Sequence, residues 1–526
     1  MKKLTLFFSR VVLASARSSL GWFVARRAMS HQSGGSRSSK VIWISRGLVS
    51  LVYLALALPV MASFSQRQRI TSAPPGVGAQ FGYAVAVGGN TMVVGARFDG
   101  TTAASAGSAF VYVLGGTNWT QQAKLLASDG AAFDKFGQSV AISEDTIVVG
   151  AYQADAPLAN GGSAYVFVRD GTTWTQQQKL TASDGTANDE FGNSVTIIGE
   201  TVFVGAHLAD LPINSEAGAV YRFTRSGTVW TQVQKLIPTA STNGPILGDH
   251  FGESLATSGH RLVVGADHDD SPATAAGAVY VFVEGGGGYV LQQKLSISDG
   301  DNGDLFGFSV AIEGNTLVAG ARDNTRIIGQ PAFGAAYVFE FDGATWTRQQ
   351  KLIASDGAAS DHFGWSVAVS DNVVAVGARD DDTVVGPDAG SAYLFTRSGT
   401  TWTQQQKLVP VDSFNGDRFG ASVALSFGNL VVGAAEKPLA SPNGQGAAYI
   451  YVPSVTSTFL SVRKLDNSQT LLTWSTNSTG YVLETTASLP AMTWSSVTNA
   501  AAIAGDQFAV TVETASRQQF FRLYKP

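Results

Sequence analysis

The residues of this 526-residue chain with the clearest potential for ion chemistry are aspartates that recur at one position. Six of them each stand two residues before a Phe-Gly dipeptide: Asp134, Asp189, Asp249, Asp304, Asp361 and Asp417. One hypothesis is a ring of carboxylates that binds Ca²⁺ or a cationic ligand. The other is that each aspartate accepts N–H bonds within its own turn, as Asx turns do. We favour the turn role, because a single site seldom needs six copies of one residue.

Two denser acidic clusters lie in loops whose sequences differ among otherwise similar segments: Asp267, Asp269 and Asp270, and Asp380, Asp381 and Asp382. Variable loops suit recognition, so these six are the candidate ligand-binding residues. Asp-x-Asp spacing can offer oxygens to a hard cation, but neither loop holds the roughly six to eight oxygens that Ca²⁺ takes. Solvated charge is the simpler interpretation of both clusters.

Motifs for catalysis or for a cofactor are absent from the sequence. The histidines His207, His250, His260, His268 and His362 have no metal-binding spacing such as H-E-x-x-H, and no G-x-S-x-G or phosphate loop occurs. The chain has no cysteine, which excludes disulfides, thiolate metal sites and a cysteine nucleophile. We therefore predict a protein that is not an enzyme and has no cofactor, with Ca²⁺ as the one ion to consider.

The elements that must position these residues recur seven times. Phe-Gly begins at residues 81, 136, 191, 251, 306, 363 and 419. Around each copy the same short segments return; in the second copy they are 136–143, 146–151, 162–171 and 173–180. Each is rich in Val, Ile, Phe and Tyr and is bounded by Gly, Asp, Asn or Ser, which is typical of strands. Four strands in about 56 residues make one propeller blade, so the fold class is all-β, a seven-bladed β-propeller over residues 63–453.

Two repeated features indicate how the blades pack. The second segment ends in Gly-Ala in every copy, which indicates a positive φ or a close backbone approach. Aromatic residues at one position of the fourth segment, five Trp and Tyr289, favour packing between blades over a ligand platform.

The two ends of the array predict how the ring closes. The last copy lacks a fourth segment after Pro453, whereas Gln66–Ile70 precedes the first Phe-Gly at the spacing of one. We expect this N-terminal segment to complete the seventh blade and to remove both free sheet edges.

The pattern of Phe-Gly followed some 14 residues later by Gly-Ala resembles the FG-GAP repeats of the integrin alpha-chain propeller, and most of all their bacterial secreted versions. The resemblance covers residues 66–452 and implies an extracellular, often adhesive, seven-bladed propeller. Integrin-type repeats carry a calcium loop, D-x-D-x-D-G-x-x-D, after the Phe-Gly strand. The matching turns here, such as Ser143-Glu144-Asp145, are too short and too poor in carboxylates, so calcium binding does not carry over to them.

Both termini lie outside the repeat. Residues 1–62 contain nine basic residues and no acid, and end in the apolar segment Gly47–Ala62, which predicts a signal peptide cleaved after Ala62. Cleavage leaves 26 basic against 40 acidic residues, which disfavours nucleic acid as a partner. Residues 454–526 alternate in short segments and predict a small, fibronectin III-like β-sandwich with Trp474 and Trp494 in its core.

These features predict a secreted or cell-surface adhesion propeller. It is expected to be a monomer, to meet the membrane only through its signal segment, and to recognise an extracellular protein or glycan through loops on one face. A secreted carbohydrate-active hydrolase with its site in those loops is the alternative, and a purely structural matrix module is a third possibility.

Overall fold

The computed structural model describes residues 42–45, 63–72, 78–155, 158–211, 215–238, 248–270, 273–324, 332–426, 428–437 and 444–453, together with the strands of a C-terminal module. The chain divides into two compact units, one of residues 59–454 and one of residues 1–58 with 455–526. The described residues form strands and turns and no α-helix, so none of them builds a helix of membrane-spanning length and hydropathy.

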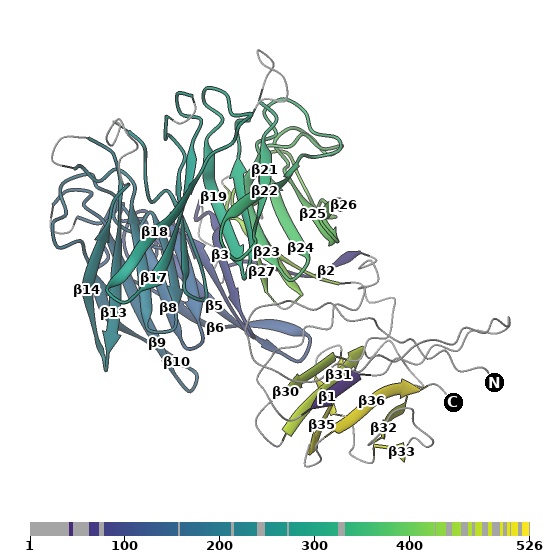
Figure 1. Cartoon of the computed structure of the whole chain (residues 1–526). Helices are drawn as coiled ribbons and strands as arrows, with labels where there is room; N and C mark the ends of the chain where they lie inside the picture. Colours follow the sequence, from purple (N-terminus) through teal and green to yellow (C-terminus); the bar gives the residue numbers. More distant parts are fainter. Residues whose placement is uncertain are drawn as a thin grey trace. The chain divides into compact units, whose positions relative to one another are not determined.

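The larger unit consists of seven four-stranded antiparallel sheets (Figure 1), which confirms the seven-bladed propeller. The first four blades are β3 (Phe81–Gly88), β4 (Thr91–Ala96), β5 (Ser108–Gly115), β6 (Asn118–Leu125); β7 (Ser139–Ser143), β8 (Thr146–Ala151), β9 (Ser163–Asp170), β10 (Thr173–Leu180); β11 (Ser194–Ile198), β12 (Thr201–Ala206), β13 (Ala219–Ser226), β14 (Val229–Leu236); and β15 (Ser254–Ser258), β16 (Arg261–Ala266), β17 (Ala278–Gly285), β18 (Gly288–Leu295). The last three are β19 (Phe306–Glu313), β20 (Thr316–Ala321), β21 (Ala335–Phe341), β22 (Trp346–Leu352); β23 (Phe363–Ser370), β24 (Val373–Ala378), β25 (Ser391–Ser398), β26 (Thr401–Leu408); and β27 (Phe419–Ser426), β28 (Asn429–Ala434), β29 (Ala447–Pro453), β2 (Phe64–Ile70).

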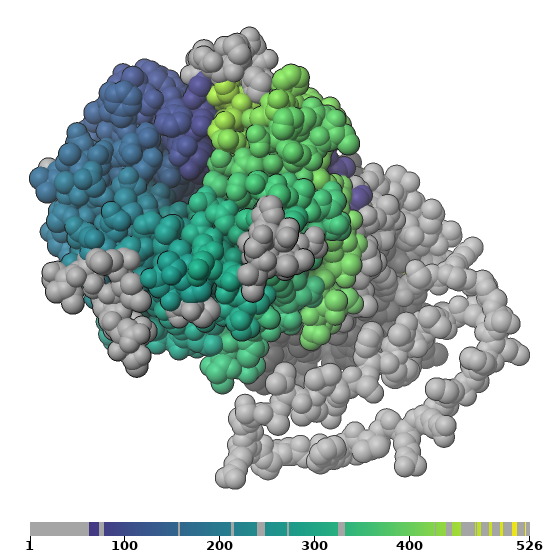
Figure 2. Space-filling model, turned by 90° about the horizontal axis from the view of Figure 1, so that it is seen from above, coloured from purple at the N-terminus to yellow at the C-terminus, as the bar shows by residue number. Residues whose placement is uncertain are grey.

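The seventh blade takes its outer strand from the N-terminal side of the repeats, as predicted. Strand β2 pairs antiparallel with β29, and it begins two residues earlier than the sequence indicated, at Phe64. The ring also closes at its centre, where Phe81 forms a parallel bridge with Gly446. Figure 2 shows the purple first blade and the yellow-green last blade side by side. The first and last blades are thus joined within one chain, both at the outer strand of the last blade and at the centre of the ring.

The repeated Gly-Ala glycine is required by a close approach between blades rather than by its φ. A Cβ on Gly95 would lie 2.1 Å from the Gly137 carbonyl oxygen of the next blade. At the seam, a Cβ on Gly433 would lie 1.9 Å from the Gly82 carbonyl oxygen. Any side chain here would push two blades apart.

The aromatic residues of the outer strands pack between blades, as expected. Trp402 is 2% exposed, and Phe64, at the same position of β2, is 5% exposed. A glutamine of the preceding blade clasps the aromatic residue's backbone: Gln350 Oε1 accepts the Trp402 N–H at 2.8 Å, while its Nε2 donates to the Trp402 carbonyl. Gln406 makes the same two bonds to Phe64, so the clasp also closes the ring.

The C-terminal module is a β-sandwich of two four-stranded sheets, as predicted. One contains β30 (Ser461–Lys464), β31 (Gln469–Ser475), β35 (Gln507–Glu513) and β34 (Ala502–Ala504); the other contains β1 (Ile42–Ser45), β36 (Gln518–Tyr524), β32 (Val482–Thr486) and β33 (Ser495–Ser496). Trp474 of the first sheet and Phe521 of the second share one core, whereas Trp494 lies outside the described residues. Strand β1 comes from the segment predicted to be a signal peptide, so its cleavage would remove this strand from the sheet.

Candidate functional site

The connections between successive blades lie beside the loops that join the second and third strands of each blade. The N–H of Lys135, in the connection from the first blade to the second, donates to the Ser105 carbonyl in the loop between β4 and β5. The following residue, Phe136, donates to Ala106 in the same way. Equivalent bonds recur at the other blades, such as Phe419 to Ala389. These loops form one continuous surface around the inner ends of the blades.

The residue immediately before each Phe-Gly has a left-handed backbone, with φ between 52° and 58°. This holds in all seven blades, at Gln80, Lys135, Glu190, His250, Leu305, His362 and Arg418. Glycine would adopt this φ without strain, whereas other residues lose about 1 kcal/mol or more. The chain nevertheless places a different, mostly polar side chain there in nearly every blade. We infer that these side chains are retained for what they contact.

Two further repeat positions vary in the same manner. The residue after Phe-Gly is Tyr83, Gln138, Asn193, Glu253, Phe308, Trp365 or Ala421, and the residue after Gly-Ala is Arg97, Tyr152, His207, Asp267, Arg322, Arg379 or Ala435. We call these three sets of seven the axial cluster.

Contacts link the members of the axial cluster from blade to blade. Arg97 of the first blade donates to Gln138 of the second at 3.1 Å, and Gln138 donates to Asn193 of the third at 3.0 Å. Asn193 then donates to Glu253 of the fourth blade at 3.1 Å. Residues far apart in the sequence therefore form one polar network on the inner strands.

Arginines and aromatic rings dominate the part of the cluster that spans blades five, six, seven and one. The Arg322 guanidinium lies 4.0 Å from the centre of the Phe308 ring and 4.6 Å from that of Trp365. Arg379 stacks on Trp365 at 3.7 Å, and Arg97 stacks on Tyr83 at 3.6 Å. Such stacked pairs hold a cation and an aromatic face together at a half-buried surface.

His362 carries a positive charge between two carboxylates of the same region. Its Nε2 lies 3.2 Å from Asp323 and its Nδ1 lies 2.7 Å from Asp380. These hydrogen bonds, first to Asp323 and then to Asp380, raise the pKa of His362 to about 9, from an ordinary value of 6.5. Arg379 and Arg418 also pair with Asp380.

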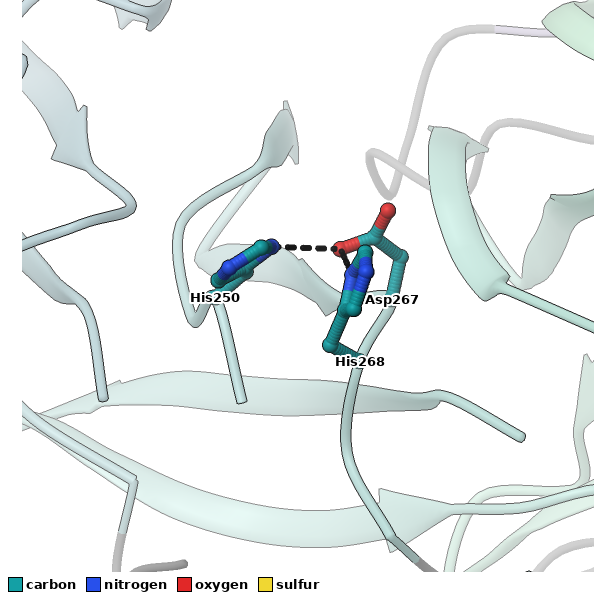
Figure 3. Close-up of side chains that lie close together, drawn as sticks. All are labelled: His250, Asp267 and His268. Atoms are coloured by element: carbon teal, nitrogen blue, oxygen red, sulfur yellow. Dashed lines mark hydrogen bonds and ion pairs between the residues drawn. The ribbon is translucent and has the colours of Figure 1, made fainter. Parts of the chain in front are cut away.

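Histidines and carboxylates occupy the cluster in blades three and four, and Figure 3 shows His250, Asp267 and His268 of the fourth blade. His268 Nδ1 lies 3.0 Å and His250 Nδ1 lies 3.6 Å from one oxygen of Asp267. Burial raises the pKa of Asp267, but the bonds to His250 and His268 outweigh it and bring the pKa below its ordinary value. His207 Nε2 lies 3.6 Å from Glu190 and 3.7 Å from Glu253.

Burial dominates the titration of His207 and Glu253. It lowers the pKa of His207 to about 4, so this imidazole is neutral near pH 7. Burial, together with the charge of Asp267, raises the pKa of Glu253 well above its ordinary value. One carboxyl that tends to stay protonated thus faces the same region as one that stays ionised.

The aspartates before Phe-Gly are buried in their own turns, as the favoured interpretation expects. Asp134 accepts the Ala131 N–H at 2.8 Å, and Asp361 accepts the Ala358 N–H at 2.6 Å. Asp189, Asp304 and Asp417 make the same bond to the residue three positions earlier, while Asp249 is 4% exposed. Burial raises the pKa of Asp361 to about 6. These aspartates stabilise the turns that lead into the axial cluster.

The six candidate ligand-binding aspartates do not act as two sets of solvated charges, so that interpretation was wrong. Asp269 and Asp381 are each 2% exposed, because each pairs with a lysine of its own blade, Lys294 at 2.7 Å and Lys407 at 2.7 Å.

Of the other four candidates, two accept hydrogen bonds within their own loops, and two contact histidines of the axial cluster. Asp270 and the exposed Asp382 accept backbone N–H groups at 2.8 and 3.0 Å. Asp267 and Asp380 contact the histidines described above. The predicted cleavage residue, Ala62, lies outside the described residues.

Most of the axial cluster could not be recognised from linear motifs, because its residues come from different blades. The available signal was three positions that change in nearly every copy beside two dipeptides that never change. The histidine spacing was correctly judged to fit no linear motif. Only the fold brings His207, His250 and His268 together from two neighbouring blades.

Seven sheets closed into a ring around a variable polar cluster define a seven-bladed β-propeller. The model of the FG-GAP repeat matches residues 64–112, 119–167, 174–223, 230–282, 289–339, 346–395 and 402–451. The chain belongs to the FG-GAP repeat family.

More distant comparisons add little. A comparison with curated protein sequences found no match. Among solved structures, the WD40 domain of Pan2 from Neurospora crassa is similar over 76% of this chain and 97% of that domain, with 8% identity and a TM-score of 0.44.

Proposed function

We propose that this protein is a non-catalytic binding propeller that recognises an extracellular protein or glycan through the axial cluster. The observation that carries the proposal is the left-handed residue before each Phe-Gly. Seven copies bear the strain of a non-glycine residue there, with φ of 52–58°, and six of the seven side chains are polar. A purely structural turn would be served better by glycine, which argues against the matrix-module alternative.

The chemistry of the cluster supports a polar ligand with some flat or apolar surface. Arg97 donates to the uncharged amide oxygens of Gln80 and Gln138, so its charge can still pair with a carboxylate or sulfate of a ligand. The half-buried rings of Tyr83 and Trp365, with the arginines stacked on them, form a mixed aromatic and cationic surface that a sugar or an aromatic side chain of a ligand can contact. Protein and glycan ligands both present such groups.

Export and a monomeric state are part of the proposal. The basic N-terminal region followed by the apolar segment 47–62 supports export. FG-GAP repeats are typical of extracellular proteins, which agrees with action outside the cell or at its surface. The closed ring supports a monomer, since the last blade takes its outer strand β2 from the same chain and Phe81 bridges to Gly446 within that chain.

A carbohydrate-active hydrolase is the second candidate, and one observation favours it. Glycosidases need a protonated and an ionised carboxyl group beside one another, with pKa values pushed apart by their surroundings. Glu253 and Asp267 have pKa values shifted in those opposite directions. We rank binding first, because both shifts are explained by burial and by the neighbouring histidines.

The test is a binding screen of the mature protein against glycans and matrix proteins, followed by variants of the hit. Arg97→Ala and Trp365→Ala are expected to weaken binding by roughly tenfold or more each, the scale of a lost charge-assisted or stacking contact. Arg225→Ala is the matched control, since Arg225 also stacks on an aromatic ring, Trp230, but lies on an outer strand pair.

Two results would overturn this proposal. One is a ligand whose affinity falls in Arg225→Ala and not in the two axial variants, because the ligand would then bind the outer strands. The other is turnover of a polysaccharide that is lost in Glu253→Gln, which would establish the hydrolase instead.

A further inference from the structure

The site that carries a further inference is formed by His250, Asp267 and His268 in the fourth blade (Figure 3). Two imidazole nitrogens and a carboxylate oxygen, one from each residue, all lie within 4.8 Å of one another. The two imidazole rings are tilted by 45° with centres 4.1 Å apart, and both direct Nδ1 toward the same oxygen of Asp267. Figure 3 shows both histidine side chains next to that oxygen of Asp267.

The distances suit a small ion with tetrahedral preference. Zinc bonds of about 2.0–2.1 Å to nitrogen and oxygen place neighbouring tetrahedral donors roughly 3.4 Å apart. The Nδ1-to-oxygen distances here are 3.0 Å for His268 and 3.6 Å for His250, on either side of that value. An ion can therefore enter with small side-chain rotations.

The backbone holds the donors in place before any ion binds. His250 stands at the left-handed position before Phe251, with φ of 57°. The next residue but one, Gly252, donates its N–H to the Gly265 carbonyl at 3.0 Å, which fixes this segment against the strand that leads into Asp267. Rigid elements on both sides reduce the entropy that a ligand set must lose on binding.

The surroundings enclose the three donors, which are buried or half-buried in the fold. Asp267 is 2% exposed, and the His207 ring lies 5.5 Å from the His250 ring. Within the described residues, Nδ1 of His207 is buried and has no hydrogen-bond partner. A buried nitrogen without a partner costs free energy that a structural role alone does not explain.

We propose that His250, Asp267 and His268 form a binding site for a divalent transition-metal ion, with Zn²⁺ the best fit. Two imidazoles and one carboxylate suit zinc and its neighbours, whereas Ca²⁺ takes oxygen ligands in greater number. Three protein donors leave one position for water or for a donor atom of a bound molecule. The site adds a metal to a protein whose family resemblance pointed only to calcium.

The experiment uses the full chain, stripped with a chelator and titrated with ZnCl₂ in a calorimeter. One Zn²⁺ per chain is expected, and CaCl₂ at the same concentration should neither bind there nor compete. His268→Ala and Asp267→Asn should each lower the affinity for Zn²⁺ roughly 100-fold or more, since each removes a direct ligand.

The control is His260→Ala, because His260 belongs to the same blade but its side chain is 84% exposed and pairs with Glu284. This variant should bind Zn²⁺ as the parent does. Should Asp267→Asn fail to fold, anomalous diffraction from parent crystals soaked in ZnCl₂ decides, with a peak expected between the three side chains. Unchanged zinc affinity in His268→Ala, an absence of saturable binding, or a peak elsewhere would overturn the proposal. Because no organic ligand is used, these outcomes do not depend on the proposed binding function.

Discussion

Replacing Phe64 by alanine tests whether the N-terminal strand holds the propeller closed. Phe64 belongs to the core between the sixth and seventh blades, beside Leu408 and Tyr451. Its backbone also receives both bonds of the Gln406 clasp. If β2 completes the ring, Phe64 should contribute as much to the stability of the propeller as its counterpart Trp402 in the sixth blade.

The expected loss follows from burial. Phe64 is 5% exposed, and removing such a buried ring costs about 3–5 kcal/mol. The propeller spans about 390 residues, and unfolding entropy is near 2.1 cal/mol/K per residue. A unit of this size that unfolds together should therefore melt roughly 4–6 °C lower in Phe64→Ala.

The assay is thermal and urea unfolding followed by intrinsic fluorescence and circular dichroism. Trp402→Ala serves as the internal reference, and Val229→Ala, whose side chain is 57% exposed on β14, should leave the melting temperature within about 1 °C. Deleting residues 63–70 is the stronger perturbation, because it exposes the edge of β29 and should cause aggregation. A deletion variant that melts with the parent and stays monomeric would refute ring closure.

Two further predictions concern the clasps and the charged histidine. Ala123 stands where other blades have the clasping glutamine, so Ala123→Gln should add two bonds to the Trp174 backbone and raise the free energy of unfolding by about 1 kcal/mol, measured in urea; a loss of stability would contradict this. His362 has its pKa raised to about 9 from 6.5, so its charge stabilises the folded protein fully below pH 6.5, and this contribution is lost as the pH rises through 9. His362→Gln should thus be less stable than the parent by about 1–2 kcal/mol at pH 6, after allowance for solvent screening, and nearly as stable as the parent at pH 10. The same difference in stability at both pH values would exclude the charge of His362 as the cause.

The features that could be predicted from the sequence are those that the fold requires in every blade. Phe-Gly and Gly-Ala recur because the blades meet backbone to backbone, as at Gly95 and Gly137, where no side chain fits. The seven Phe-Gly copies predicted the number of blades, and the missing fourth segment of the last copy predicted how the ring closes. Even the start of β2 at Phe64 follows the repeat, since it takes the position filled by tryptophan in blade six.

The candidate site was harder to predict, because a propeller brings together residues that stand about one blade apart in the sequence. His207 and His268 are separated by a whole repeat, and no linear spacing reveals that both flank His250. Conversely, Asp267 and Asp269 are near neighbours in sequence, yet one faces the histidines and the other pairs with Lys294. Because the chain turns sharply at each strand end, residues close in sequence can belong to different contacts, and residues far apart in sequence can share one.

The same geometry explains how residues of the inner ring can differ while the close contacts between blades are kept. The close contacts between blades are made by the glycines and by the buried aromatic residues, so the residues on either side of them are free to differ. A change at position 250 or 365 alters the chemistry of the inner ring and leaves the glycine contacts as they are. The strained backbone at His250 and its six equivalents places a side chain at that ring in each blade. The repeat that dictates the fold thus also supplies seven sets of positions at which binding chemistry can differ.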